Sequence, residues 1–122
     1  MAAKVLSLPL SDREKSILHE LRDLLIRDFG NHLKLLKLFG SRSRGEGSEF
    51  SDFDVLAVVD GEPWRLSDEM HDAVYPLMRK YDYKIVISLI VLSKDHFSQI
   101  KRIRTNFYQN VKRDGIDLWT AA

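Results

Sequence analysis

Two aspartates separated by one residue are the side chains of this sequence best suited to chemistry. Asp52 and Asp54 begin an apolar run, 55–59, that is typical of a strand buried on both faces. Alternate side chains of a strand project from the same face of its sheet, so the two carboxylates are expected to converge. Neighbouring ionised carboxylates repel each other unless a cation is bound, and Mg²⁺ prefers such hard oxygen ligands. The pair therefore predicts a metal site.

A glycine- and arginine-containing segment before the aspartates has the composition of an anion site. Gly40 and Ser41 begin a turn, where glycine lets the backbone approach a phosphate and free N–H groups attract anions. Arg42 and Arg44 are close in sequence, and a guanidinium can neutralise triphosphate oxygens. A motif of this kind, Gly-Ser followed after ten residues by Asp-x-Asp, is expected by chance in roughly one per thousand chains of this length. The combination predicts metal-dependent nucleotidyl transfer.

Hydrophobic spacing predicts three helices and three strands that would position these residues. Helices are expected at 11–29, after the turn 60–63, and from 93 to 115; strands are expected at 33–39, 52–59 and 85–92. Residues 40–51 have the composition of a loop around a short helical turn. We expect an α/β (α+β) fold, a small mixed sheet covered by helices.

Some of these expectations concern single residues. The expected N-cap of the first helix is Ser11 or Asp12, and that of the third helix is Ser93. The first helix is expected to end at Gly30 and the third at Gly115. Pro76 is expected to kink or end the second helix. The inward side of one continuous third helix is expected to carry Phe97, Ile100, Ile103, Phe107 and Val111.

Composition limits the class of protein. A length of 122 residues predicts one domain, and the absence of cysteine excludes disulfides, thiolate metal sites and cysteine nucleophiles. No apolar run approaches the roughly 20 residues of a membrane span, and the first ten residues lack a secretory leader, so we expect the cytoplasm and no membrane. A net charge of +1 argues against dedicated nucleic-acid binding. Of two basic clusters, we interpret the one at 94–113 as a solvated helix face and the one at 34–44 as the functional candidate.

The segment GSRSRGEGSEFSDFD resembles the signature of the polymerase beta nucleotidyltransferase superfamily, in its compact bacterial and archaeal minimal branch. The sequences ISLIVLSKDHF and FYQNVKRDGIDLW are similar to the same branch, so the resemblance extends from Leu38 to Trp119. It implies a single nucleotidyltransferase domain at 1–122, with Mg²⁺ and ATP or another nucleoside triphosphate. It also implies phosphate binding at Gly40 and Ser41 and metal binding at Asp52 and Asp54. Members of the branch are often encoded beside a helical HEPN protein in toxin–antitoxin pairs.

The third strand departs from the family pattern. Active members carry a third carboxylate there, which helps to hold a metal and can accept the proton of the attacking hydroxyl. The interior polar residue of this strand is Ser88, our candidate for that position, and a hydroxyl is a poor base and a weak Mg²⁺ ligand. Asp82 precedes the strand and is interpreted as a surface charge. Three consequences of the missing carboxylate remain open: reduced activity with two aspartates, a base supplied by the substrate or partner, and nucleotide binding without transfer.

Three hypotheses of function follow. The first is an enzyme that moves a nucleoside monophosphate, AMP from ATP, to a hydroxyl of a partner, which the resemblance implies is a HEPN toxin. The second is a weakly active or inactive antitoxin or interaction module that neutralises its partner by binding it. A homo- or hetero-oligomer is expected as well. The third is transfer to a small molecule such as an aminoglycoside, but the chain is too short to add a drug pocket to the core. Trp119 and Phe107 are candidates for an exposed partner face.

Overall fold

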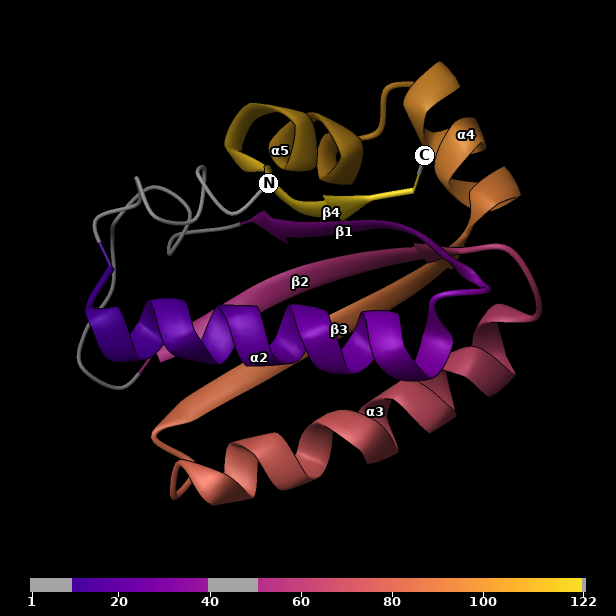
Figure 1. Cartoon of the computed structure of the whole chain (residues 1–122). Coiled ribbons are helices and arrows are strands. Elements are labelled where there is room, and N and C mark those ends of the chain that lie inside the picture. The colour runs from indigo at the N-terminus through magenta and orange to yellow at the C-terminus, as the bar shows by residue number, and fades with distance from the viewer. Residues whose placement is uncertain (1–9, 40–50, 122) are drawn as a thin grey trace.

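The computed structural model describes residues 10–39 and 51–121, and it shows helices on both sides of a four-stranded sheet (Figure 1). In chain order the elements are α2 (Asp12–Phe29), β1 (Leu33–Phe39), β2 (Ser51–Val59), α3 (Pro63–Lys80), β3 (Ile85–Ser93), α4 (Lys94–Arg102), α5 (Asn106–Asp114) and β4 (Ile116–Thr120). The expected class, a mixed sheet covered by helices, is confirmed. None of the helices in the described ranges has the length and apolar character to cross a membrane.

The sheet has the strand order β3-β2-β1-β4. β1 is antiparallel to both β2 and β4, whereas β2 and β3 are parallel and are connected through α3. A parallel pair needs such a crossover, and the crossover helix covers one face of the sheet. β2 therefore lies in the interior of the sheet, with β3 at its edge.

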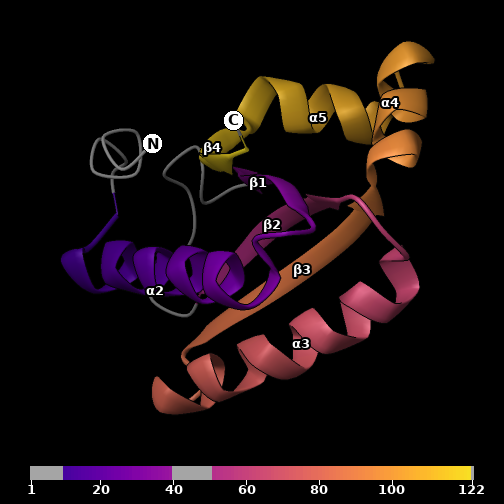
Figure 2. The ribbon, with the colours of Figure 1, turned by 45° about the vertical axis from the view of Figure 1, so that its right-hand side comes forward.

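The helices form two layers, one on each face of the sheet (Figures 1 and 2). α2 and α3 lie on one face and bury most of the core, including Leu21, Leu36 and Met70, none of which has exposed side-chain area. α4 and α5 lie over the other face, where a smaller cluster contains Leu56, Val58 and Val111. Because β2 has apolar neighbours on both sides, its residues 55–59 are buried regardless of which face they project from.

The first helix begins where the sequence predicts. The Ser11 hydroxyl accepts a hydrogen bond from the Glu14 backbone N–H at 3.1 Å, and a Glu14 carboxylate oxygen accepts one from the Ser11 N–H at 3.0 Å. This reciprocal capping box satisfies two of the backbone donors that a helix start leaves without partners. The helix ends at Gly30, as expected. Ser93 also caps α4 through a bond from the His96 N–H.

Pro76 does not end its helix, because α3 continues to Lys80. The proline ring is on the exposed side, while Leu77 is buried and Met78 packs against the core. We attribute the continuation to this packing, which offsets the lost backbone hydrogen bond.

The predicted third helix is wrong as a single element. The chain breaks between α4 and α5, where Arg104 has a φ of 55°, and Thr105 caps a new helix by accepting from the Tyr108 N–H. The left-handed backbone at Arg104 cannot continue a right-handed helix. Ile103, expected to point inward, is 68% exposed at this break. Gly115 does end α5, and the strand β4 that follows it was not predicted.

Candidate functional site

β2 projects Asp52 and Asp54 from the same face of the sheet. The residues that alternate with them, Phe53 and Val55, are fully buried against the layer of α2 and α3. Asp52 is exposed and Asp54 is half-buried. The alternation of burial along β2 confirms that the two side chains share one face of the sheet, as strand residues two apart do. Further along the same face, Leu56 and Val58 are covered by apolar side chains.

The edge strand β3 adds Ser88 to this face. In the parallel register Ser88 lies opposite Asp54, and Val86 lies opposite Asp52. Ser88 is exposed, whereas its chain neighbours Ile87 and Leu89 are buried on the other side of the sheet. The candidate for the third position thus lies beside the aspartate pair. Val86, which the sequence analysis did not single out, is 44% exposed on the same face. The alternation of the strand was the signal that could have identified it.

The two carboxylates influence each other. Burial raises the pKa of the Asp54 carboxyl above its ordinary value, and the negative charge of Asp52 raises it further. Both effects disfavour two ionised groups at this place, and a bound cation would relieve them. Two carboxylates with an exposed approach fit a hard cation such as Mg²⁺ that takes its remaining ligands from phosphate and water. Within residues 10–39 and 51–121, no group of three or more histidines and acidic residues is arranged to hold a metal.

The predicted phosphate-binding residues Gly40, Ser41, Arg42 and Arg44 lie outside the described residues. The described chain nevertheless shows where that segment starts. Phe39, the residue before Gly40, pairs with Asp54 across β1 and β2. Phe39, the last described residue before residue 40, therefore lies beside Asp54.

The face that carries the aspartates is half covered. Over β1, the Phe39 ring contacts the Phe107 ring of α5 edge-on, with centroids 5.6 Å apart. Beside Ser88 on β3, the face continues into an apolar groove of about 380 Å³ lined by Ile90, Leu92, His96, Ile100, Thr105 and Phe107. Among residues 10–39 and 51–121, the α4–α5 layer therefore borders this face, and Asp52 at its end is exposed.

Other residues considered in the sequence take structural places. Asp82 is exposed in the turn before β3, and its φ is 56°. Lys37, in the basic cluster at 34–44, forms an ion pair with Asp117 of β4 at 2.7 Å. Trp119 and Phe107 are partly buried and packed against the two cores, so the expectation that they are exposed is wrong.

Sequence comparison gives the class of protein to which this fold belongs. The family model of the nucleotidyltransferase domain matches residues 18–116. The chain is 33% identical over 102 residues to MJ0604 of Methanocaldococcus jannaschii, which is named as a protein adenylyltransferase; the match covers 84% of this chain and 94% of that protein. The chain therefore belongs to the nucleotidyltransferase domain family, and it is a nucleotidyltransferase.

Two solved structures share the fold. One is a chain of a toxin–antitoxin solved with AMP-PNP, with a TM-score of 0.52 and 20% identity over 85% of this chain and 73% of that chain. The other is described as a nucleotidyltransferase from Sulfolobus solfataricus, with a TM-score of 0.51 and 22% identity over 86% of this chain and 81% of that chain. At these identities the likeness concerns the fold.

Proposed function

We propose that residues 1–122 form one nucleotidyltransferase domain that moves AMP from ATP to a hydroxyl of a partner protein, in the presence of Mg²⁺. The observation that carries the proposal is the exposed face shared by Asp52, Asp54 and Ser88, in a chain 33% identical to a protein named as a protein adenylyltransferase. The fold similarity to a chain of a toxin–antitoxin is in keeping with a partner protein. That this partner is a HEPN toxin, with this chain as its antitoxin, is what the resemblance of the sequence implies.

Each residue of the proposed site has a distinct task. Gly40 and Ser41 hold the triphosphate, and Arg42 and Arg44 neutralise its oxygens. The acceptor oxygen forms a bond to the α-phosphorus as the bond to the pyrophosphate oxygen breaks. A group of the acceptor protein, or solvent, takes the hydroxyl proton, because a serine at 88 is a poor base.

Asp52 and Asp54 are the proposed metal ligands. When bound, Mg²⁺ would stabilise negative charge on the phosphates and orient them for in-line displacement. The buried side of β2 fixes the direction of the two carboxylates through Phe53 and Val55. The raised pKa of Asp54 is consistent with a site that is electrostatically incomplete without a cation.

A second candidate function is neutralisation of the partner by binding, with weak transfer or none. The observation that favours it is the hydroxyl of Ser88 opposite Asp54, where active relatives are expected to carry a carboxylate. The motif would then bind nucleotide without transferring it.

The two functions are separated by one experiment. The chain is incubated with Mg²⁺, ATP labelled at the α-phosphate, and the protein encoded by the neighbouring gene. We expect label on that protein, and we expect Asp52→Asn/Asp54→Asn to abolish it. Asp60→Asn/Asp82→Asn is the matched control, because it removes the same charge from exposed carboxylates outside the site.

Each outcome decides between the functions. Label that is lost in the first variant and kept in the control supports transfer. If no label forms and the first variant still neutralises the partner, transfer is wrong and binding is the function. Equal loss in both variants would mean that overall charge, rather than the aspartate pair, governs the reaction.

A further inference from the structure

A basic concave surface lies at the junction of α4 and α5. It is a hollow of about 690 Å³ lined by Lys101, Arg104, Tyr108, Gln109, Lys112 and Arg113. Lys101 comes from the end of α4, Arg104 from the break, and the others from α5. The sequence analysis interpreted these cations as a solvated helix face. The tertiary structure instead gathers them around a cavity.

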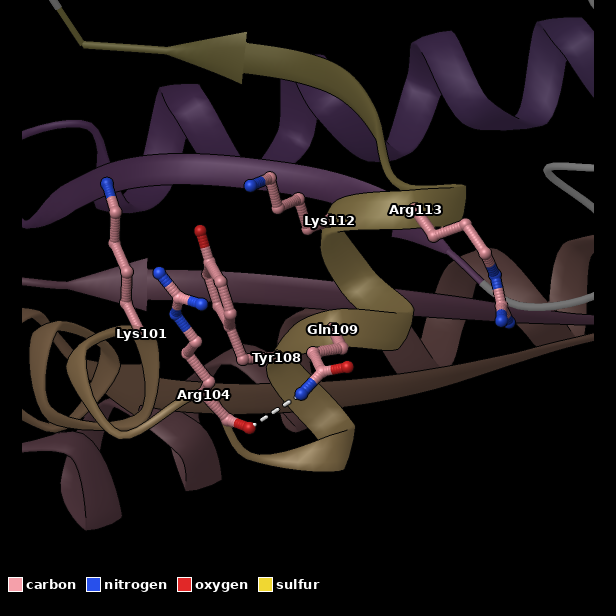
Figure 3. Close-up of a pocket in the computed structure, with 6 residues that line it drawn as sticks. All are labelled: Lys101, Arg104, Tyr108, Gln109, Lys112 and Arg113. Atoms are coloured by element: carbon pink, nitrogen blue, oxygen red, sulfur yellow. Dashed lines mark hydrogen bonds between the residues drawn. The ribbon is translucent and has the colours of Figure 1, made fainter.

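Three of the cations that line the hollow are available to pair with a ligand. Across the described ranges, no carboxylate lies within 4.0 Å of the charged groups of Lys101, Arg104 or Lys112. Arg113 differs, because it donates to both Asp114 oxygens at 3.1 and 3.0 Å. Figure 3 shows Lys101, Arg104, Tyr108 and Lys112 extending to one side of α5, with Arg113 on the other side. A concave group of like charges raises the local concentration of anions.

Hydrogen bonds and a ring contact hold the backbone around the hollow in shape. Gln109 donates its side-chain N–H to the Arg104 carbonyl at 2.8 Å, and the Thr105 N–H donates to the Ile100 carbonyl at 3.2 Å. The Phe97 ring contacts the Tyr108 ring edge-on, with centroids 5.8 Å apart. These contacts fix the left-handed Arg104 and the direction of α5, so the backbone positions that carry the cations are set before a ligand binds.

The same junction borders the aspartate face on its other side. Thr105 and Phe107 line the apolar groove that also contains Ile90, and Ile90 follows Ser88 by two residues on the same face of β3. Between the groove and the hollow, Ile103 is 68% exposed. A bound segment that extended from the hollow over Ile103 and the apolar groove would lie along the face that carries Ser88, opposite Asp54. This sequence of surfaces suits a protein segment.

We propose that the α4–α5 hollow binds an acidic segment of the acceptor protein and so orients the acceptor hydroxyl toward Asp52 and Asp54. The proposal rests on transfer to a protein. Carboxylates of such a segment would pair with Lys101, Arg104 and Lys112, and the Tyr108 hydroxyl would donate to one of them. An acidic protein fits better than nucleic acid, because the whole chain has a net charge of +1 and the hollow offers few phosphate contacts.

Binding is tested with a fluorescent ten-residue peptide of alternating glutamate and serine, measured by anisotropy. We expect it to bind, and we expect Lys101→Ser/Lys112→Ser to weaken binding about tenfold, which is about 1.4 kcal/mol. A peptide with glutamine in place of glutamate should not bind. Arg79→Ser/Lys84→Ser is the matched control, since it removes two exposed cations elsewhere and should leave the affinity unchanged.

Asp52→Asn/Asp54→Asn should bind the peptide as tightly as the native chain, so the proposal can be judged even if no transfer occurs. Where transfer occurs, Lys101→Ser/Lys112→Ser should raise KM for the acceptor protein at unchanged kcat. The proposal is wrong if the peptide does not bind or if both cation variants weaken it equally. It is also wrong if a ten-nucleotide single-stranded RNA binds more tightly than the peptide and loses affinity in the same variant, because the hollow would then be a nucleic-acid site.

Discussion

Removing one charge from the aspartate pair should stabilise the metal-free protein. The perturbation is Asp54→Asn, which keeps the shape of the side chain. Burial and the charge of Asp52 raise the pKa of Asp54, so its ionised form at neutral pH destabilises the fold relative to the unfolded chain. The destabilisation is fully present above the raised pKa, and it disappears as the pH falls to the ordinary value of 3.8. The variant should therefore unfold at a higher temperature at pH 7 but not at pH 3.

The magnitude follows from strand geometry. Side chains two residues apart on one face are about 6.7 Å apart at the usual rise of roughly 3.3 Å per residue. Coulomb repulsion at that distance is about 0.6 kcal/mol at a dielectric constant of 80 and about 2.5 kcal/mol at 20, so about 1 kcal/mol is a fair value for this half-open face. With an unfolding entropy of roughly 2.1 cal/mol/K per residue over 122 residues, Tm should rise by about 4 °C.

The assay is thermal unfolding followed by circular dichroism, with EDTA and then with Mg²⁺. An ion at ten times its Kd stabilises a folded protein by about 1.4 kcal/mol. Mg²⁺ should therefore raise the Tm of the native chain above the Tm of Asp54→Asn. Asp60→Asn, which removes an exposed carboxylate, is the control and should change Tm by less than about 2 °C. A lower Tm for Asp54→Asn in EDTA would refute the repulsion argument. Equal stabilisation of both proteins by Mg²⁺ would show that the ion binds elsewhere.

Three further predictions concern single residues. Ser88→Asp should raise any transfer rate, measured with labelled ATP, because it adds a carboxylate opposite Asp54; a larger gain from Val86→Asp would assign the third position to the residue opposite Asp52. Ser11→Ala should lower the unfolding free energy by about 1 kcal/mol in urea titration, since it removes the cap of α2, and an unchanged midpoint would contradict the role of the capping box. Leu36→Ala should cost about 2–5 kcal/mol in the same titration, because Leu36 is fully buried between the helices and the sheet; a loss below 1 kcal/mol would mean that the core collapses around it.

Local patterns predicted most of the fold because each depends on near neighbours. The cap at Ser11, the strand at 85–92 and the end of α5 at Gly115 follow from the hydrogen bonding and side-chain alternation of a few consecutive residues. The α4–α5 break was not predicted, and of the two effects expected of Pro76 the helix end does not occur; packing decided both. A helix pattern continues across 103–105, but Thr105 caps a second helix and Arg104 adopts a left-handed backbone.

The missing strand has a similar explanation. β4 is short, and it exists through its pairing with β1, a partner that lies far away in the sequence. No local pattern records which distant strand offers free hydrogen-bonding groups, so a five-residue run after a helix is ambiguous until the sheet is assembled.

By itself, the sequence determined the identity and spacing of Asp52 and Asp54, the face that they share, and the choice of Ser88 as the candidate for the third position of the proposed site. Strand periodicity is local, and it needs no knowledge of the rest of the chain. Only the tertiary structure decided that Ser88 lies opposite Asp54, because the register of parallel strands depends on the packing of α3 between them. It also decided that the cations of α4 and α5 surround a hollow, since charge in a sequence has no shape until the helices that carry it are packed.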